Sequence, residues 1–92
     1  MRKRVKIDRD AAESLAVQAL TFLAADPARL GRFLALTGIG PEKIRTAAAS
    51  PGFLAGVLDH VASEEALLVA FAGEAEIAPG DIERARRALD EQ

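Results

Sequence analysis

The chain has 92 residues, of which 50% are apolar, 28% charged and 4% aromatic, with a formal net charge of −2 and no cysteine. A chain of this length builds one core and buries about 60–65% of the surface of its unfolded state, which predicts a single domain without a deep enclosed active site. The lack of cysteine excludes disulfides, thiolate nucleophiles and zinc–thiolate sites.

The first nine residues are strongly basic. Residues 1–9 carry five basic side chains and one acid, and the basic ones include Arg2, Lys3, Arg4 and Lys6. We predict a basic, flexible arm over residues 1–9 and a single helical domain over residues 10–92. No apolar run of a secretory signal follows the arm, and no stretch approaches the ~20 apolar residues that span a bilayer. We therefore expect a soluble, cytoplasmic protein that does not bind membranes.

The remaining charges are also distributed unevenly. Residues 10–26 carry three acids, residues 27–45 carry four basic side chains and one acid, and residues 46–92 carry nine acids and three arginines. This polarity suits either head-to-tail charge complementarity or a basic face that meets an anionic partner.

Six helix starts are predicted in chain order. Asp10 stands in capping-box spacing to Glu13 and predicts the first start, and Ser63, ahead of two glutamates, predicts the fifth. The other four starts are at prolines, which the first turn of a helix tolerates, and three of these follow a residue type that caps helices: Pro27, Pro41, Pro51 and Pro79.

Apolar residues recur at three- and four-residue steps after each start, which is the spacing of a buried helix face. The helix over roughly 10–25 also has apolar residues beside this stripe, including Val17, and we expect it to be central and covered on most sides. In the next helix, over 27–37, Thr37 falls on the apolar stripe. A short helix around Ile44 follows, then a strongly periodic one that contains Leu58, another that ends near Ala75, and a last one that reaches Leu89.

No segment alternates with the period of two that marks a strand. The sequence therefore predicts an all-α fold, a compact single-domain bundle of five or six short helices joined by turns at 38–40, 49–50, 62–63 and 75–79. The chain has only four phenylalanines and no tryptophan or tyrosine, which predicts a thin, tightly packed bundle without a roomy ligand cavity.

The segment from Leu36 to Arg45 resembles the helix-hairpin-helix motif of DNA- and RNA-handling proteins, whose loop reads apolar, x, Gly, apolar, Gly and is often followed by proline. In that motif the loop N–H groups and the start of the second helix face a phosphate. The N–H groups at a helix start lack partners within the helix, and the helix dipole is positive there, so both attract an anion. The resemblance implies nucleic-acid contact through Gly38, Ile39, Gly40, Arg29, Arg32, Lys43 and Arg45.

A purely structural interpretation of the same segment stands beside it. Gly38 is then the left-handed residue that ends a helix, and Ile39 fills the core. Two departures from the motif favour this interpretation: Ile44 stands where the motif has a small residue, and the chain is acidic after residue 46.

The single histidine, His60, stands four residues before Glu64, a spacing that places two metal ligands on one helix face. Structural zinc needs four ligands, and a helix break near Ser63 would spoil the spacing. We therefore predict no metal site, no cofactor and no catalytic residue. An enzyme would require a cleft that gathers His60 with two carboxylates.

Four runs of the sequence, ALTFLAADP (19–27), LGRFLALTG (30–38), PGFLA (51–55) and VLD (57–59), carry a resemblance over roughly residues 10–90. They are similar to a small family of helical proteins from alphaproteobacteria, the domain-of-unknown-function family 3572. The resemblance implies no particular activity.

We predict a small non-enzymatic module that binds another protein. A small bundle that has two charge poles and no concentrated chemistry acts by presenting a surface. The alternative is a nucleic-acid-binding protein that uses the hairpin-like turn and the basic arm.

Overall fold

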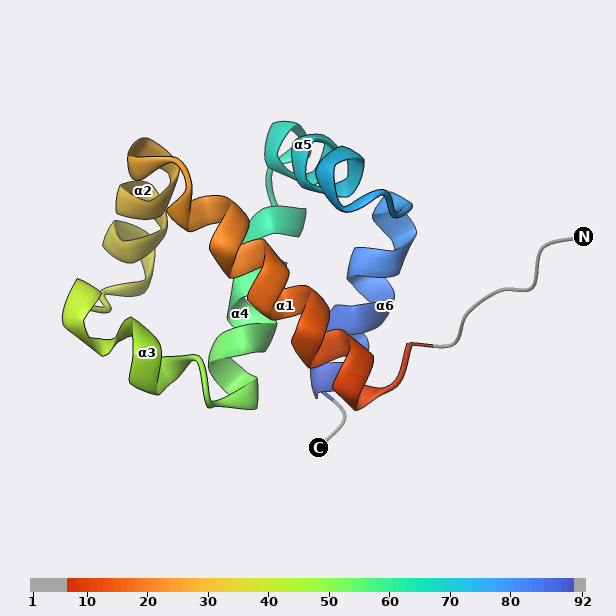
Figure 1. The fold of residues 1–92 in the computed structure, drawn as a ribbon, viewed down its shortest axis with the longest axis horizontal. Helices are drawn as coiled ribbons and strands as arrows, with labels where there is room; N and C mark the ends of the chain where they lie inside the picture. Colours follow the sequence, from red (N-terminus) through yellow and green to blue (C-terminus); the bar gives the residue numbers. More distant parts are fainter. Residues whose placement is uncertain (1–6, 91–92) are drawn as a thin grey trace, which may run out of the picture.

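The computed structural model describes residues 7–90, and these form helices and short connections without a strand (Figure 1). The elements in chain order are α1 (Arg9–Ala24), α2 (Pro27–Thr37), the 3₁₀ turn η1 (Pro41–Lys43), α3 (Ile44–Ala47), α4 (Pro51–Ala62), α5 (Glu65–Ala75) and α6 (Pro79–Asp90). The predicted all-α, single-domain bundle of short helices is confirmed.

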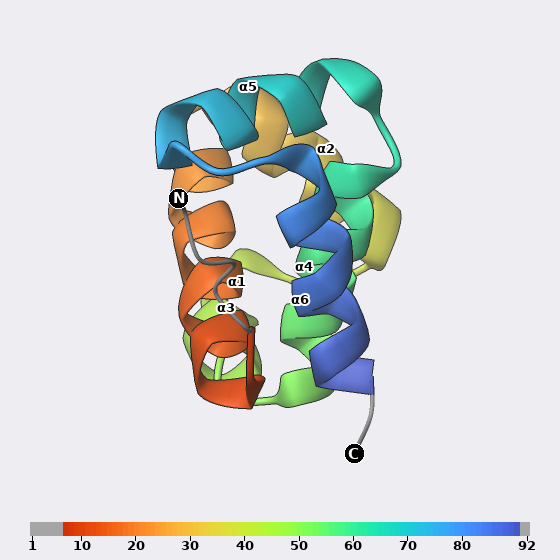
Figure 2. The same cartoon turned by 90° about the vertical axis from the view of Figure 1, so that its right-hand side faces the viewer.

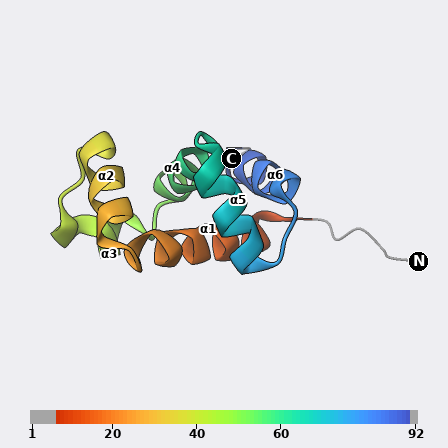
Figure 3. The same ribbon diagram turned by 90° about the horizontal axis from the view of Figure 1, so that it is seen from above.

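Three helices, α1, α4 and α6, pack on one another and form the centre of the molecule. Helix α5 lies across one end of these three, and it contacts α4, α6 and α1 (Figure 2). The segment from α2 to α3 stands to one side of the centre, with α2 packed on α1 (Figures 1 and 3). The molecule thus has a helical body and a lateral hairpin, α2–η1–α3.

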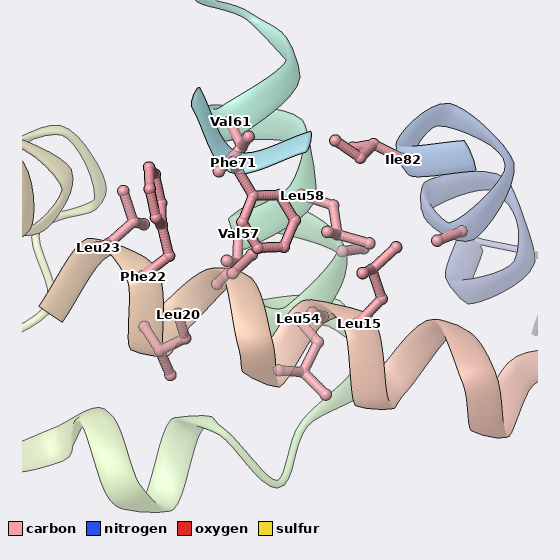
Figure 4. Packing of buried hydrophobic residues seen from close by; sticks show 14 of the residues in the cluster. Leu15, Leu20, Phe22, Leu23, Leu54, Val57, Leu58, Val61, Phe71 and Ile82 are labelled. Carbon is pink, nitrogen blue, oxygen red and sulfur yellow. The ribbon is translucent and has the colours of Figure 1, made fainter. Parts of the chain in front are cut away.

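The core lies where α1, α4, α5 and α6 meet. Val57, Leu58 and Val61 on α4 are fully buried, which confirms the predicted periodic face of this helix. Phe71 of α5 points toward α1, where its ring centroid lies 5.4 Å from that of Phe22 (Figure 4). Small residues of α1 allow the close approach of the other helices, and three of them have no exposed surface: Ala12, Ala16 and Ala19.

Side-chain caps fix the starts of the two proline-opened helices that follow Asp26 and Ser50. The Oδ1 atom of Asp26 accepts hydrogen bonds from the N–H groups of Ala28 and Arg29, at 3.0 and 3.5 Å. The Oγ atom of Ser50 accepts from the N–H of Phe53 at 3.5 Å. These caps satisfy amides that have no partner inside the helix, and they confirm the starts predicted at Pro27 and Pro51.

The first helix begins earlier than predicted. Asp8, with an extended backbone, is the N-cap of α1, and its Oδ1 accepts from the N–H of Ala11 at 2.9 Å, whereas Asp10 lies inside the first turn. Ile7 packs against the core, so the end of the predicted arm belongs to the fold. Residues 1–6, with Arg2, Lys3, Arg4 and Lys6, lie outside the described residues, and the flexible arm stays a prediction there.

The start predicted at Ser63 is also displaced. Ser63 has a helical backbone and ends α4, and its hydroxyl donates to the carbonyl oxygen of His60 at 2.8 Å. Glu64 has the extended backbone of an N-cap and precedes α5. Because an N-cap residue has an extended backbone and Ser63 has a helical one, Ser63 does not cap the next helix.

Two expectations about burial are wrong. Val17 is 45% exposed, because none of the other helices covers this side of α1. Thr37 is exposed at the last position of α2, where its hydroxyl donates to the carbonyl oxygen of Leu34 at 3.3 Å. A threonine at a helix end has this local acceptor, so its place on the stripe did not require burial.

Candidate functional site

The turn between α2 and η1 contains the glycines singled out in the sequence. Gly38 has φ +76°, and its N–H donates to the carbonyl oxygen of Leu34 at 2.8 Å, which confirms the left-handed helix end. The N–H of Ile39 donates to Oγ1 of Thr37 at 3.3 Å. Ile39 is half-exposed and lies outside the buried cluster, so the expectation that it fills the core is wrong. Two of the loop amides are thus bonded within the chain.

A carboxylate lies beside the third loop residue, Gly40. A Cβ atom placed on Gly40 would lie 2.6 Å from Oε2 of Glu42. A phosphate at this glycine would meet a like charge. In addition, the second half of the hairpin is only a 3₁₀ turn and the four residues of α3. The geometry is that of a helix connection with a negative charge at its second glycine.

The four basic residues of the predicted phosphate site fall into two groups. Lys43 and Arg45 are exposed, and no ion pair within residues 7–90 includes them. Arg29 and Arg32 lie on α2 and line a pocket to which Lys43 and Arg45 do not contribute. The structure therefore does not gather the predicted residues at one phosphate position.

This pocket has a volume of about 290 Å³ and lies between the start of α2, the end of α4 and the start of α5. Four of its lining residues are polar: Arg29, Arg32, His60 and Glu64. Ala66 and Leu67 form part of its apolar wall. We call it the α2/α4/α5 pocket.

Each arginine of the pocket is held by an acid. Nη2 of Arg32 lies 2.7 Å from Oε2 of Glu64, which joins α2 to the start of α5. Nε of Arg29 lies 3.7 Å from Oδ2 of Asp26, and its guanidinium stacks 4.6 Å from the centroid of the Phe22 ring. A guanidinium over an aromatic face is attracted by the ring quadrupole, so the position of Arg29 is fixed from two sides.

His60 contributes a ring that packs edge-on against Phe33, with centroids 5.1 Å apart. Its Nε2 atom is buried and has no hydrogen-bond partner within the described chain. A single carboxylate, that of Glu64, lines the pocket with it, together with two guanidinium groups. Within residues 7–90, no group of three histidine, aspartate or glutamate side chains is arranged to hold a metal.

The sequence did not reveal this pocket. The only sign of it in the sequence is the four-residue spacing of His60 and Glu64, which suits two metal ligands on one helix face. The helix ends at Ala62, and Glu64 turns to Arg32 on a different helix. Only the packing of α2 against the body brings these residues together.

A second charged cluster ties α6 to α4. Arg86 bonds Glu83 at 2.6 Å and Asp90 at 3.1 Å on its own helix, and its Nε lies 4.0 Å from Asp59 of α4. The hydrogen bond from Arg86 lowers the pKa of Glu83, and the same bond raises the pKa of Arg86. Arg87 lies 3.8 Å from Glu83, four residues earlier on the same helix. This cluster is structural, because its acids and bases satisfy one another.

Within residues 7–90 three large apolar side chains are exposed, each on a different helix: Val17 at 45%, Leu36 at 67% and Val69 at 58%. Leu36 lies in the last turn of α2, next to the hairpin turn. It is the most exposed of the three and the only one on the lateral hairpin.

Over residues 9–92 the chain matches the family described as "Protein of unknown function (DUF3572)", and it belongs to that family. No curated protein and no solved structure matches it. Among the helices of residues 7–90, none has the length and hydropathy to cross a membrane.

Proposed function

We propose that the chain is a small non-enzymatic protein-interaction module, and that the lateral hairpin α2–η1–α3 is its contact surface. The supporting observation is the exposure of Leu36, which is 67% accessible on a segment that stands beside the helical body. Covering such a leucine on binding contributes about 1.5–3 kcal/mol. Burial of apolar surface is the dominant favourable contribution to most protein–protein association.

The charge of the hairpin indicates the chemistry of the partner. Residues 27–45 carry four basic side chains and one acid, although the whole chain has a net charge of −2. Lys43 and Arg45 are exposed on the same hairpin as Leu36. We infer that the partner is a protein segment with acidic side chains around an apolar one, since complementary charge steers and orients association.

Nucleic acid is the alternative ligand of the same hairpin. One contact disfavours a phosphate at the loop amides, where the nucleic-acid motif would place it: the Glu42 carboxylate lies beside Gly40. Binding of nucleic acid is tested by titrating a labelled duplex at low salt. We expect no binding at physiological salt. Micromolar, salt-sensitive binding that is abolished by Lys43→Ala with Arg45→Ala would reverse the ranking.

The interaction surface is tested by affinity capture with three proteins: the wild type, Leu36→Gln and Val69→Gln. Both substitutions replace an exposed apolar side chain on a helix with a neutral polar one, so neither removes core contacts. We expect a nuclease-resistant protein, with an acidic segment at the contact, that wild type and Val69→Gln retain and Leu36→Gln loses. Equal retention by the two variants would remove the hairpin from the proposal. Capture of a second copy of this chain would identify its acidic region 46–92 as the partner segment.

We place this function in the cytoplasm. The proposal rests on the sequence, which carries no cysteine and therefore suits a reducing compartment.

A further inference from the structure

We propose that the α2/α4/α5 pocket is a binding site for the carboxylate group of a small organic acid or of a peptide end. This site goes beyond the proposed contact around Leu36: it uses Arg29 and Arg32 near the start of α2, and it does not include Leu36, Lys43 or Arg45. The observation that carries it is the convergence of two guanidinium groups and a histidine from two helices on one pocket.

The pocket already contains one carboxylate–guanidinium pair. Arg32 is bonded to Glu64 at 2.7 Å, and the Arg32 side chain is still 63% exposed. A planar guanidinium carries five donors, so one glutamate does not use them all. An incoming carboxylate can therefore share Arg32 with Glu64 or replace it.

The Glu64 carboxylate has an alternative contact when a ligand displaces it from Arg32. It is the N-cap residue of α5, yet its side chain makes no capping hydrogen bond, because the carboxylate pairs with Arg32. The first amides of an α-helix lack partners within the helix and favour negative charge. A Glu64 carboxylate released from Arg32 thus exchanges one favourable contact for another. Glu64 is therefore an internal competitor of the ligand for Arg32.

The other polar groups of the pocket favour a ligand that carries a hydrogen-bond acceptor. Arg29 is held in place by Phe22 and Asp26, so its guanidinium is pre-organised. His60 lines the pocket, and its buried Nε2 atom has no hydrogen-bond partner within the described chain. With the proton on Nε2 the ring is a donor without an acceptor, and a carboxylate oxygen is an acceptor of the kind that it lacks.

The size and the walls of the pocket define the rest of the ligand. A volume of about 290 Å³ lies at the lower limit of ligand pockets, which suits a small molecule or a chain end. Ala66 and Leu67 give the pocket an apolar wall. The ligand class is therefore a carboxylate attached to a short apolar group.

The probe for this site is butyrate, with butyramide as the neutral control of the same shape. We titrate each into the full chain and follow the backbone amide resonances of Ala66 and Leu67 and the ring resonances of His60. Butyrate is expected to give saturable shifts at these residues, and butyramide none. Equal shifts with the two probes, or no shifts with butyrate, would overturn the proposal.

Three variants test the assigned contacts. Arg32→Gln is expected to weaken butyrate binding about tenfold, the loss typical of one charge-assisted hydrogen bond. Glu64→Gln is expected to tighten it, because the internal competitor is neutralised. Arg45→Gln, an exposed arginine outside the pocket, is the matched control and leaves the affinity unchanged. An Arg32→Gln affinity equal to that of Arg45→Gln, or no tightening by Glu64→Gln, contradicts the assignment.

Two further experiments identify the source of the carboxylate and distinguish this site from the hairpin. Acetyl-trialanine with a free C-terminal carboxylate is compared with its amide and with butyrate. Tighter binding of the peptide acid assigns the site to a protein chain end, and tighter binding of butyrate assigns it to a free acid. Leu36→Gln is expected to leave butyrate binding unchanged. Affinity capture therefore tests the hairpin contact and butyrate titration tests the pocket, so the failure of one proposal is distinguished from the failure of the other.

Discussion

The rings of Phe33 and His60 meet edge-on, with centroids 5.1 Å apart and planes at 63°. Phe33 is 1% exposed and is the only residue of α2 that is fully buried, and its ring also contacts that of Phe53, 5.9 Å away. One aromatic side chain thus anchors the lateral hairpin to α4, and it contacts His60, which lines the α2/α4/α5 pocket.

Replacing Phe33 by alanine should therefore release the hairpin. We expect Phe33→Ala to lower the free energy of unfolding by about 3–5 kcal/mol, because it removes a buried ring and leaves a cavity. Hydrogen exchange should rise most over residues 27–48. Leu36→Ala on the same helix removes an exposed side chain and serves as the control, with little effect on stability. Uniform loss of protection over the whole chain would contradict a hairpin anchored by this ring.

The core of the helical body is tested at Leu58, which has no exposed surface at the centre of α4. We expect Leu58→Ala to cost about 2–5 kcal/mol in urea denaturation. Val69→Ala, at a side chain that is 58% exposed, provides the comparison and should change stability by less than about 0.5 kcal/mol. Overlapping melts of Leu58→Ala and the wild type would show that the core has been placed on the wrong face of α4.

The hairpin turn depends on the left-handed backbone of Gly38, at φ +76°. Gly38→Ala should destabilise the protein by roughly 1 kcal/mol, because an L side chain is strained in this region. Gly80 lies inside α6, where a Cβ would have its nearest contact at 3.9 Å, and Gly80→Ala should be neutral or slightly stabilising. Equal effects of the two substitutions on thermal unfolding would refute the role of Gly38.

The sequence predicted the helices well where a local signal was sufficient. Pro27 and Pro51 follow Asp26 and Ser50, whose side chains cap the next amides, so both starts were correct. The left-handed backbone of Gly38 was also predicted correctly, because a helix often ends in a residue of positive φ, which glycine adopts without strain. Cap, proline and glycine act within a few residues, and the sequence shows all three directly.

Features that depend on packing could not be predicted in the same way. Asp8 and Asp10 are both acids near a helix start, and only the backbone shows that Asp8 is the cap. The ion pair of Arg32 with Glu64 joins α2 to the start of α5, and η1, α3 and α4 lie between them in the sequence. No periodicity encodes such a pair, and the candidate site therefore became visible only in the structure.

The pair of Glu83 and Arg86 predicts a pH dependence. The hydrogen bond from Arg86 holds the pKa of Glu83 below its ordinary value of 4.5, so the bond stabilises the folded state above that value. This stability is lost as the pH falls through the lowered pKa. Glu83→Gln should thus lower the thermal midpoint at pH 7, and the difference from wild type should shrink as the pH falls below 4.5. Glu74→Gln, at an exposed carboxylate of α5, is the control and should leave the thermal midpoint at pH 7 unchanged.

Photo-crosslinking inside cells of the organism of origin shows whether the hairpin around Leu36 contacts a protein. A photoreactive amino acid is placed at position 36, or at position 69 as the control, since both side chains are exposed and apolar. We predict a nuclease-resistant protein adduct from position 36, with the crosslink in an acidic segment of the partner, and its loss when Lys43 and Arg45 are changed to glutamate. Adducts of equal yield from both positions, or an adduct with nucleic acid at position 36, would contradict a specific protein contact at the hairpin.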